Sequence, residues 1–366
     1  MEDPRLPDYG SGCISDLMPL LLGFGEPRGT WFPREVWEAE RRVLVVLDGL
    51  GWEQLQAHAE WAPTLTAMNG GAITTVAPST TAAALTSITT GLTPGEHGVI
   101  GYRMVVDHEV LNCLRWGTPS HPDARSSIPP DSIQPFPPFL GRAPALVSKA
   151  EFSRSGFTQA HLRGGRLTGY RMASTMVVET ARLLREGERF VYAYYDGVDK
   201  VAHEYGFAEP YRAELQAADR LVADLLDAAP TGTAFLITAD HGHVDCGDRL
   251  LPLHAEVLEH TEALSGEGRF RWLHAKPGRL GDLLAAAQDW HGQQAWVRSI
   301  DQIVDERWFG TTVRPEVRDR LGDVALCPME DVAFEDPDDT GPFELKGRHG
   351  SLTPAEMLVP CISAVA

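Results

Sequence analysis

"RVLVVLD" (residues 42–48) is a nearly unbroken apolar run that ends on the carboxylate of Asp48. A strand buried on both faces has this continuous pattern, whereas a half-exposed strand alternates between apolar and polar residues. Two later runs have the same form, FVYAYY at 190–195 and TAFLIT at 233–238. The three runs therefore predict neighbouring strands of one buried, parallel sheet.

Acidic residues follow all three runs. Asp48 closes the first, Asp196 and Asp199 come after the second, and Asp240 comes after the third. In open α/β sheets, ligands bind outside the carboxyl ends of the strands. We therefore expect these carboxylates to converge at one edge of the sheet.

Amphipathic helical patterns lie between the runs, at 175–187 and 211–229. Strands that alternate with helices predict an α/β fold with a doubly wound, mostly parallel sheet and helices on both faces. The length of 366 residues suits one large domain that carries an insertion.

The composition describes a globular chain, with 43% hydrophobic and 23% charged residues. No apolar run is long enough to span a membrane, and the formal charge of -19 argues against binding to duplex nucleic acid or anionic lipid. Bound metal ions would supply the positive charge that a phosphate ligand needs. Five scattered cysteines without a CxxC pair predict reduced, buried thiols, and the lack of a recognisable export segment predicts a cytoplasmic location.

Three later motifs contain histidine, and two of them also contain aspartate. Asp199 and His203 are four residues apart, which places both side chains on one face of a helix. Asp240 and His241 directly follow a predicted strand, and His349 stands between two glycines. Aspartate and histidine ligands without cysteine are typical of catalytic zinc, with manganese as an alternative, and a set this large can hold two ions.

The segment APSTTAAALTSITTG (77–91) predicts a helix that begins after Pro78, with Ser79 and Thr80 as capping residues. The apolar stripe of this helix, extended back by one turn, reaches Thr81. Thr81 is thus expected to face inward at a helix N-terminus, where backbone N–H groups and the helix dipole favour a phosphate oxyanion. A threonine nucleophile needs a metal ion or a base beside it. The later hydroxyls of this helix are expected to bond to preceding carbonyls, namely Thr86, Ser87, Thr89 and Thr90.

Two segments interrupt the alternation within the single predicted domain, 1–366. Residues 100–145 predict a β-hairpin around Asp107 and His108 followed by a proline-rich lid. Residues 265–325 predict a small αβ insertion. Aromatic residues of the first segment could stack on a base or aryl group of a substrate or simply pack the lid, and they are Tyr102, Trp116, Phe136 and Phe139. Of these four, Tyr102 and Trp116 are the expected substrate-binding residues.

The order of these motifs resembles the alkaline phosphatase superfamily. Asp48 follows a strand, PSTT with Thr81 opens a helix that ends TTGLTPGEHG, and DKVAHEYG, TADHG and GRHG come next in that order. The sequence looks most similar to the type I phosphodiesterase and nucleotide pyrophosphatase branch, over residues 42–247 and 346–366. Residues 270–320 contain no motif of that branch.

The resemblance implies a site with two zinc ions, or manganese in their place. One ion would be held by Asp199, His203 and His349, and the other by Asp48, Asp240, His241 and the hydroxyl of Thr81. Asp199 matches the motif rather than Asp196, because only Asp199 stands four residues before His203. Asp196 is expected to lie behind the ligands or to cap a loop, and His97 and His243 are expected to support the site without binding metal.

The implied activity is hydrolysis of a small-molecule phosphate ester, either a phosphodiester or a nucleotide pyrophosphate, through a phosphothreonine on Thr81. The nucleotide pyrophosphatases carry an asparagine three residues after the nucleophile, where this sequence has Ala84, so a nucleotide substrate is less favoured. A phosphonate hydrolase or a phosphomonoesterase would have the same ligands, although the serine and arginine motif of alkaline phosphatase itself is missing. A phosphosugar mutase is disfavoured by the small insertion, and a non-catalytic metal-binding descendant by the complete set of ligands.

Overall fold

The RVLVVL run forms β1 (Arg41–Leu47), the middle strand of a seven-stranded sheet in the computed structural model, which describes residues 3–339 and 344–366. Residues 1–2 and 340–343 of the predicted domain lie outside this description. The strand order is β2 (Asn69–Thr74), β17 (Leu358–Val365), β8 (Thr233–Thr238), β1, β7 (Phe190–Tyr195), β5 (Ala145–Lys149) and β6 (Arg166–Tyr170). The three predicted strands are confirmed as β1, β7 and β8, and they lie side by side and parallel.

The other four strands of this sheet were not predicted. β5 and β6 continue the parallel arrangement beyond β7, whereas β17 enters antiparallel between β8 and β2. The sheet is therefore mixed but mostly parallel, as expected. Because β1, β7 and β8 run in one direction, their carboxyl ends meet at a single edge.

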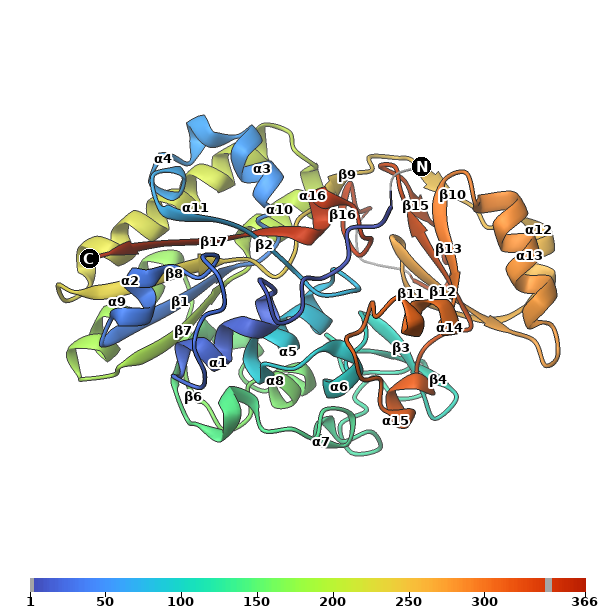
Figure 1. Cartoon of the computed structure of the whole chain (residues 1–366), viewed down its shortest axis with the longest axis horizontal. Helices are drawn as coiled ribbons and strands as arrows, with labels where there is room; N and C mark the ends of the chain where they lie inside the picture. Colours follow the sequence, from blue (N-terminus) through green and yellow to red (C-terminus); the bar gives the residue numbers. More distant parts are fainter. Residues whose placement is uncertain (1–2, 340–343) are drawn as a thin grey trace.

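Helices cover this sheet. In the view of Figure 1, α3 (Trp52–Ala57), α4 (Pro63–Thr66) and α11 (Glu209–Ala228) lie above it, and α1 (Leu17–Leu21), α5 (Thr81–Thr90) and α8 (Gly156–His161) lie below it. α2 (Arg34–Glu38) contacts β8 and β17, and α9 (Ala173–Arg185) contacts β5, β6 and β7. The two predicted helices are present as α9 and α11. The apolar residues between the sheet and its helices form the main core.

A second sheet lies to one side, on the right in Figure 1. It is antiparallel, in the order β11 (Thr261–Glu267), β12 (Phe270–Ala275), β14 (Val324–Pro328) and β13 (Ala295–Ser299). Its helices are α12 (Ala255–His260), α13 (Leu280–His291), α14 (Ile300–Asp305) and α15 (Pro315–Arg318). α12 and α13 enclose a small apolar core of their own against this sheet. The sheet spans 261–328, so the predicted insertion at 265–325 falls within it.

The predicted hairpin consists of β3 (Arg103–Val106) and β4 (Glu109–Asn112), and its turn residues Asp107 and His108 have φ angles of 50° and 67°. β3 contacts β11 of the second sheet. The proline-rich stretch that follows contains α7 (Pro130–Ile133).

Several further short elements lie between the longer ones. They are α6 (Pro94–His97), the strand pair β9 (Val244–Asp245) with β16 (Gly347–Arg348), and α16 (Pro354–Met357); a further pair, β10 (Leu250–Leu251) with β15 (Ala333–Phe334), lies beside the second sheet. All five cysteines are free and buried, as predicted. Within the described residues, no helix combines the length and apolarity needed to cross a membrane.

Candidate metal centre

Predicted ligands from four parts of the sequence meet at the carboxyl edge of β1, β7 and β8. Their ligand atoms form two overlapping groups, in each of which all atoms lie within 4.8 Å of one another. The first group is Asp199, His203, His243 and His349, and the second is Asp48, Asp199 and His241. Asp199 belongs to both groups and so lies between them.

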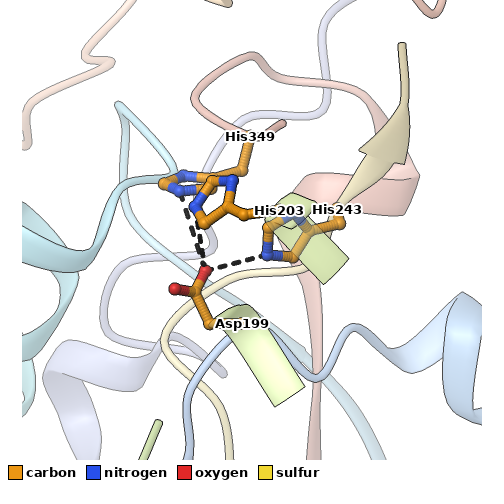
Figure 2. A group of neighbouring side chains, drawn as sticks. All are labelled: Asp199, His203, His243 and His349. Atoms are coloured by element: carbon orange, nitrogen blue, oxygen red, sulfur yellow. Dashed lines mark hydrogen bonds and ion pairs between the residues drawn. The ribbon is translucent and has the colours of Figure 1, made fainter. Parts of the chain in front are cut away.

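In the first group, three imidazoles face one carboxylate oxygen (Figure 2). The distances from Asp199 Oδ1 are 3.2 Å to His203 Nε2, 2.9 Å to His243 Nε2 and 4.0 Å to His349 Nε2. Asp199 and His203 lie one turn apart on α10 (Gly197–Tyr205), as their spacing predicted. His243 was expected only to support the site, yet its ring lies nearest to this oxygen.

The chain reaches this arrangement through a close approach of β16 to α10. A Cβ atom at Gly347 would lie 2.3 Å from the carbonyl oxygen of Ala202, so only glycine allows this packing. The approach brings the Gly347 carbonyl within 2.7 Å of His203 Nδ1 and places His349, two residues later, beside α10. The first glycine of the GRHG motif, Gly347, therefore has a packing role.

Backbone carbonyls orient the imidazoles of three predicted ligands. Nδ1 lies 2.7 Å from the Gly347 carbonyl in His203, 2.9 Å from the Ser79 carbonyl in His349 and 3.1 Å from the Gly242 carbonyl in His241. A proton on each Nδ1 satisfies the carbonyl and leaves a lone pair on Nε2. This is the usual state of an imidazole that binds metal through Nε2.

The second group surrounds the hydroxyl of Thr81. His241 Nε2 lies 3.1 Å from Thr81 Oγ1, 3.6 Å from Asp48 Oδ1 and 3.5 Å from Asp240 Oδ2. Asp240 Oδ1 accepts hydrogen bonds from the backbone N–H groups of Gly49 and His241, at 3.0 and 3.1 Å. The hydroxyl of Tyr194 donates to Asp48 Oδ2.

Two carboxylate oxygens around His241, one from the second group and one from the neighbouring Asp240, fit a cation. Asp48 Oδ1 and Asp240 Oδ2 are buried, and neither has a hydrogen-bond partner among the residues that the structure describes. Both oxygens face the Nε2 atom of His241. Buried carboxylate oxygens normally have a partner, and a divalent cation with mixed oxygen and nitrogen ligands satisfies this set.

Burial and mutual repulsion set the charge of these groups. Burial raises the pKa of Asp48 well above its usual range, and the charges of Asp240 and Asp199 raise it further. Burial also raises the pKa of Asp240, and the nearby His241 only partly offsets this effect. Burial acts in the same direction on Asp199, but the charge and hydrogen bond of His203 and the hydrogen bond of His243 outweigh it, so the pKa of Asp199 is well below its usual range. Bound cations would relieve the repulsion among these carboxylates.

Thr81 is the first residue of α5, so its hydroxyl lies at the N-terminus of a ten-residue helix. The helix begins as expected, but the capping hydroxyls were assigned wrongly. Ser79 Oγ donates to the Ser351 carbonyl at 2.7 Å, and Thr80, although it occupies the N-cap position, makes no side-chain capping bond. The Thr80 side chain instead acts on the carboxyl of Glu267 on β11, where it partly offsets the rise in pKa that burial causes. Both hydroxyls join the helix start to other segments of the site.

The other hydroxyls of α5 follow the prediction with one exception. Thr86, Thr89 and Thr90 donate to carbonyls one turn earlier. Ser87 Oγ instead lies 2.9 Å from His97 Nε2, while the backbone N–H of Val99 donates to His97 Nδ1. His97 thus fixes the turn after α5, in line with its expected supporting role.

Two cavities meet at Thr81 and Asp199. The larger, about 870 Å³, has charged and polar residues on its walls, among them Arg115, Lys200 and Glu267. The smaller, about 190 Å³, is mainly apolar and is lined by residues such as Leu85, Phe157 and Tyr192. A substrate can therefore present polar groups on one side of Thr81 and an apolar group on the other.

The aromatic residues proposed for substrate stacking have separate positions. Tyr102 lines the larger cavity. The expectation for Trp116 was wrong, because its ring is completely buried and its indole N–H donates to the Ile128 carbonyl at 2.8 Å. Phe139 is also completely buried, and Phe136 packs against the Arg314 guanidinium. Sequence patterns cannot distinguish a buried aromatic side chain in a lid from one at its surface.

Asp196 lies beside the site and forms ion pairs with two lysines. Its carboxylate forms ion pairs with Lys149 Nζ at 2.6 Å and with Lys200 Nζ at 2.7 Å. It precedes α10 but makes no side-chain capping bond. Asp196 lines the smaller cavity and pairs with the two lysines, and the loop-capping alternative does not hold.

The chain belongs to the type I phosphodiesterase/nucleotide pyrophosphatase family, whose model matches residues 42–352. It is therefore a phosphohydrolase family member with a mostly parallel α/β fold and buried histidine and aspartate groups suited to metal. No curated protein sequence is similar enough to match.

Solved structures with the same fold include the murine ectonucleotide pyrophosphatase/phosphodiesterase 5, with a TM-score of 0.66 and 16% identity over 88% of this chain and 87% of that one. An inactive threonine-to-alanine variant of the murine protein in complex with AMP has a TM-score of 0.66 and 15% identity over the same shares. Phosphonoacetate hydrolase from Sinorhizobium meliloti 1021 in complex with phosphonoformate has a TM-score of 0.65 and 18% identity over 91% of both chains.

Proposed function

We propose that this chain is a metal-dependent phosphodiesterase or nucleotide pyrophosphatase that uses Thr81 as its nucleophile. The observation that carries the proposal is the position of the Thr81 hydroxyl. It opens helix α5, lies 3.1 Å from His241 Nε2, and borders both cavities. Membership of the family supports the reaction class.

The predicted ligands divide between two cations. Asp199, His203 and His349 would hold one, and Asp48, Asp240, His241 and the Thr81 hydroxyl would hold the other, with zinc as the proposed metal and manganese as the alternative. When bound, such ions lower the pKa of a coordinated hydroxyl or water and stabilise charge on the attacking and leaving oxygens.

The residues of the chain then perform an in-line displacement in two steps. Thr81 Oγ loses its proton to solvent and forms a bond to phosphorus as the bond from phosphorus to the leaving-group oxygen breaks. The leaving-group oxygen takes up a proton from solvent, so the step gives a phosphothreonine and releases an alcohol or phosphate. A water molecule attacks phosphorus from the opposite side, and the phosphothreonine bond breaks to restore Thr81. The N-terminus of α5 favours the negative charge on the phosphoryl oxygens throughout.

The position one turn after Thr81 bears on the substrate. Ala84 is completely buried, and its methyl group cannot donate a hydrogen bond to a phosphoryl oxygen. Oxyanion stabilisation would then depend on the cations and on the start of α5. Because Ala84 replaces the asparagine of the nucleotide pyrophosphatases, hydrolysis of a phosphonate stays an alternative. The fold of phosphonoacetate hydrolase is about as similar to this chain as that of the murine phosphodiesterase.

Replacement of Thr81 tests the proposal. Thr81→Ala is expected to lower kcat by about 10³-fold or more, while elemental analysis still finds bound metal, because binding and electrostatic contributions survive loss of the nucleophile. Thr81→Ser, which keeps a hydroxyl at the same position, is the matched control and should retain activity. A fully active Thr81→Ala variant would exclude the nucleophile assignment.

A substrate comparison separates the reaction classes. Bis(p-nitrophenyl) phosphate, p-nitrophenyl phosphate and phosphonoacetate are compared on the metal-loaded protein by kcat/KM. The proposal expects the diester to be hydrolysed fastest. Turnover of the phosphonate alone would favour carbon–phosphorus hydrolysis at the same residues.

A further inference from the structure

His243 contacts the carboxylate that both ligand groups share, yet the ligand assignment gives it no role. It lies just before β9, and its side chain is completely buried. Its Nε2 atom lies 2.9 Å from Asp199 Oδ1, nearer than the corresponding atoms of His203 and His349 (Figure 2). This position is compatible with two roles for the ring, as a metal ligand or as a hydrogen-bond donor to the Asp199 carboxylate.

The second ring nitrogen distinguishes the two roles. In His203, His241 and His349, a backbone carbonyl lies within hydrogen-bond distance of Nδ1, so the proton is held there and Nε2 is free to bind a cation. His243 Nδ1 is buried and has no hydrogen-bond partner among the described residues. Metal binding through His243 Nε2 would place the proton on Nδ1 and leave a buried N–H group without an acceptor, which proteins rarely tolerate.

The Asp199 carboxylate also needs a hydrogen-bond donor, which favours the donor role for His243. In the neutral form that binds metal, His203 and His349 each hold their single proton at Nδ1 against a carbonyl and present a lone pair toward Asp199 Oδ1. This form suits a cation between the rings and the carboxylate, but neither ring then donates a hydrogen bond to Oδ1. His243 is the remaining imidazole of this group, and it can place an N–H group directly on Oδ1.

We propose that His243 is a positioning residue that donates a hydrogen bond from Nε2 to Asp199 Oδ1 and holds this carboxylate between the two metal sites. The inference rests on the proposed metal centre and adds a residue that the ligand set does not contain. Carboxylate ligands that receive such a hydrogen bond are fixed in orientation, so less freedom is lost when the metal binds.

The surroundings hold the His243 ring in this position. Gln54 Nε2 donates to the His243 carbonyl at 2.5 Å, and the next residue, Val244, pairs with Arg348 in the short sheet of β9 and β16. A Cβ atom at Gly49 would lie 2.8 Å from His243 Nε2 and 2.8 Å from Asp199 Cα. The absence of a side chain at Gly49 therefore lets the imidazole and the carboxylate meet.

Two substitutions separate a hydrogen-bond donor from a ligand. His243→Gln retains an N–H donor of similar reach, whereas His243→Met retains volume and removes the donor. His291→Met, which removes a buried imidazole in α13 far along the chain from the site, controls for general destabilisation. Zinc affinity is measured by competition with a chromophoric chelator, the number of bound ions by elemental analysis, and coordination by the visible spectrum of the cobalt-substituted protein.

The proposal expects His243→Met to weaken zinc binding at one site by about 10- to 100-fold while the number of ions at saturation and the cobalt spectrum stay unchanged. His243→Gln and His291→Met should bind zinc within a few-fold of the wild type. Loss of an ion or an altered cobalt spectrum in both His243 variants would make His243 a ligand and overturn the proposal. Wild-type affinity in His243→Met would overturn it as well.

A measurement on the unaltered chain does not depend on the folding of any variant. In the zinc-loaded protein, long-range ¹H–¹⁵N correlation spectra report which imidazole nitrogen carries the proton. The proposal expects the proton of His243 on Nε2, and a proton on Nδ1 would refute it. A wild-type chain that binds no metal would refute the metal centre and this inference together, whereas a chain that binds two ions but hydrolyses no phosphate ester would refute the proposed function alone.

Discussion

Removal of the buried guanidinium of Arg269 should destabilise the whole chain. Arg269 precedes β12 of the second sheet, and Glu356 lies in α16 beside the main sheet; both side chains are completely buried. The guanidinium donates to Glu356 from Nε at 2.7 Å and from Nη2 at 2.8 Å, and its Nη1 donates to the carbonyls of Val332 and Glu330. This ion pair therefore connects the second sheet to the segment that carries His349.

The size of the expected decrease in Tm follows from the contacts that Glu356 keeps and loses in Arg269→Met. Glu356 would keep two neutral donors, the Ser351 N–H at 2.9 Å and the Thr353 hydroxyl at 2.6 Å, but would lose its only charged partner in the structure described. Removing one member of a buried ion pair costs about 3–5 kcal/mol. For a chain of 366 residues, an unfolding entropy of about 2.1 cal/mol/K per residue converts a loss of about 4 kcal/mol into a decrease in Tm of about 5 °C.

Calorimetry on Arg269→Met, Glu356→Met and the double variant measures this effect. The double variant buries no uncompensated charge, so its Tm should lie above the value expected if the two single effects added. A decrease in Tm of less than about 1 °C for Arg269→Met, or strict additivity in the double variant, would refute the reasoning.

Two further changes test the packing around the site. Burial lowers the pKa of His97 to about 3. Between pH 3 and about pH 6.5, His97 is therefore protonated in the unfolded chain and neutral in the folded chain. The free energy of unfolding should therefore fall by up to about 1.4 kcal/mol per pH unit as the pH drops below 6.5, and urea titrations should show a shallower dependence in His97→Gln. Gly49 has a φ angle of +77° and no room for a Cβ atom, so Gly49→Ala should lower both Tm and zinc affinity. Gly232→Ala, at φ +82° with open space around it, should lower Tm only slightly and leave zinc affinity unchanged, and equal effects of the two substitutions would contradict this account.

Local sequence patterns were sufficient to predict the three central strands of the main sheet. The continuous apolar runs at 42–47, 190–195 and 233–238 are typical of strands buried on both faces, and the parallel direction of these strands placed Asp48 and Asp240 at one edge. The spacing of Asp199 and His203 likewise fixed their geometry, because residues four apart on a helix lie on one face.

Other features depend on partners that are distant in sequence. LVPCISAV, 358–365, has an apolar pattern like that of β1, but its antiparallel entry between β8 and β2 is decided by the strands beside it. The burial of Trp116 depends on the start of α8, where Gly156 leaves room for the indole ring. Periodicity describes one segment at a time and carries no information about such contacts.

The candidate site shows the same division. The sequence by itself determined which residue types follow the strands and which threonine opens α5, because both follow from local patterns along the chain. Only the tertiary structure decided that His243 lies 2.9 Å from Asp199 Oδ1 while its Nδ1 lacks a partner, and that glycines at 49 and 347 allow the segments to meet. These are contacts between segments far apart in sequence, and their distances are fixed by the packing of the whole sheet edge.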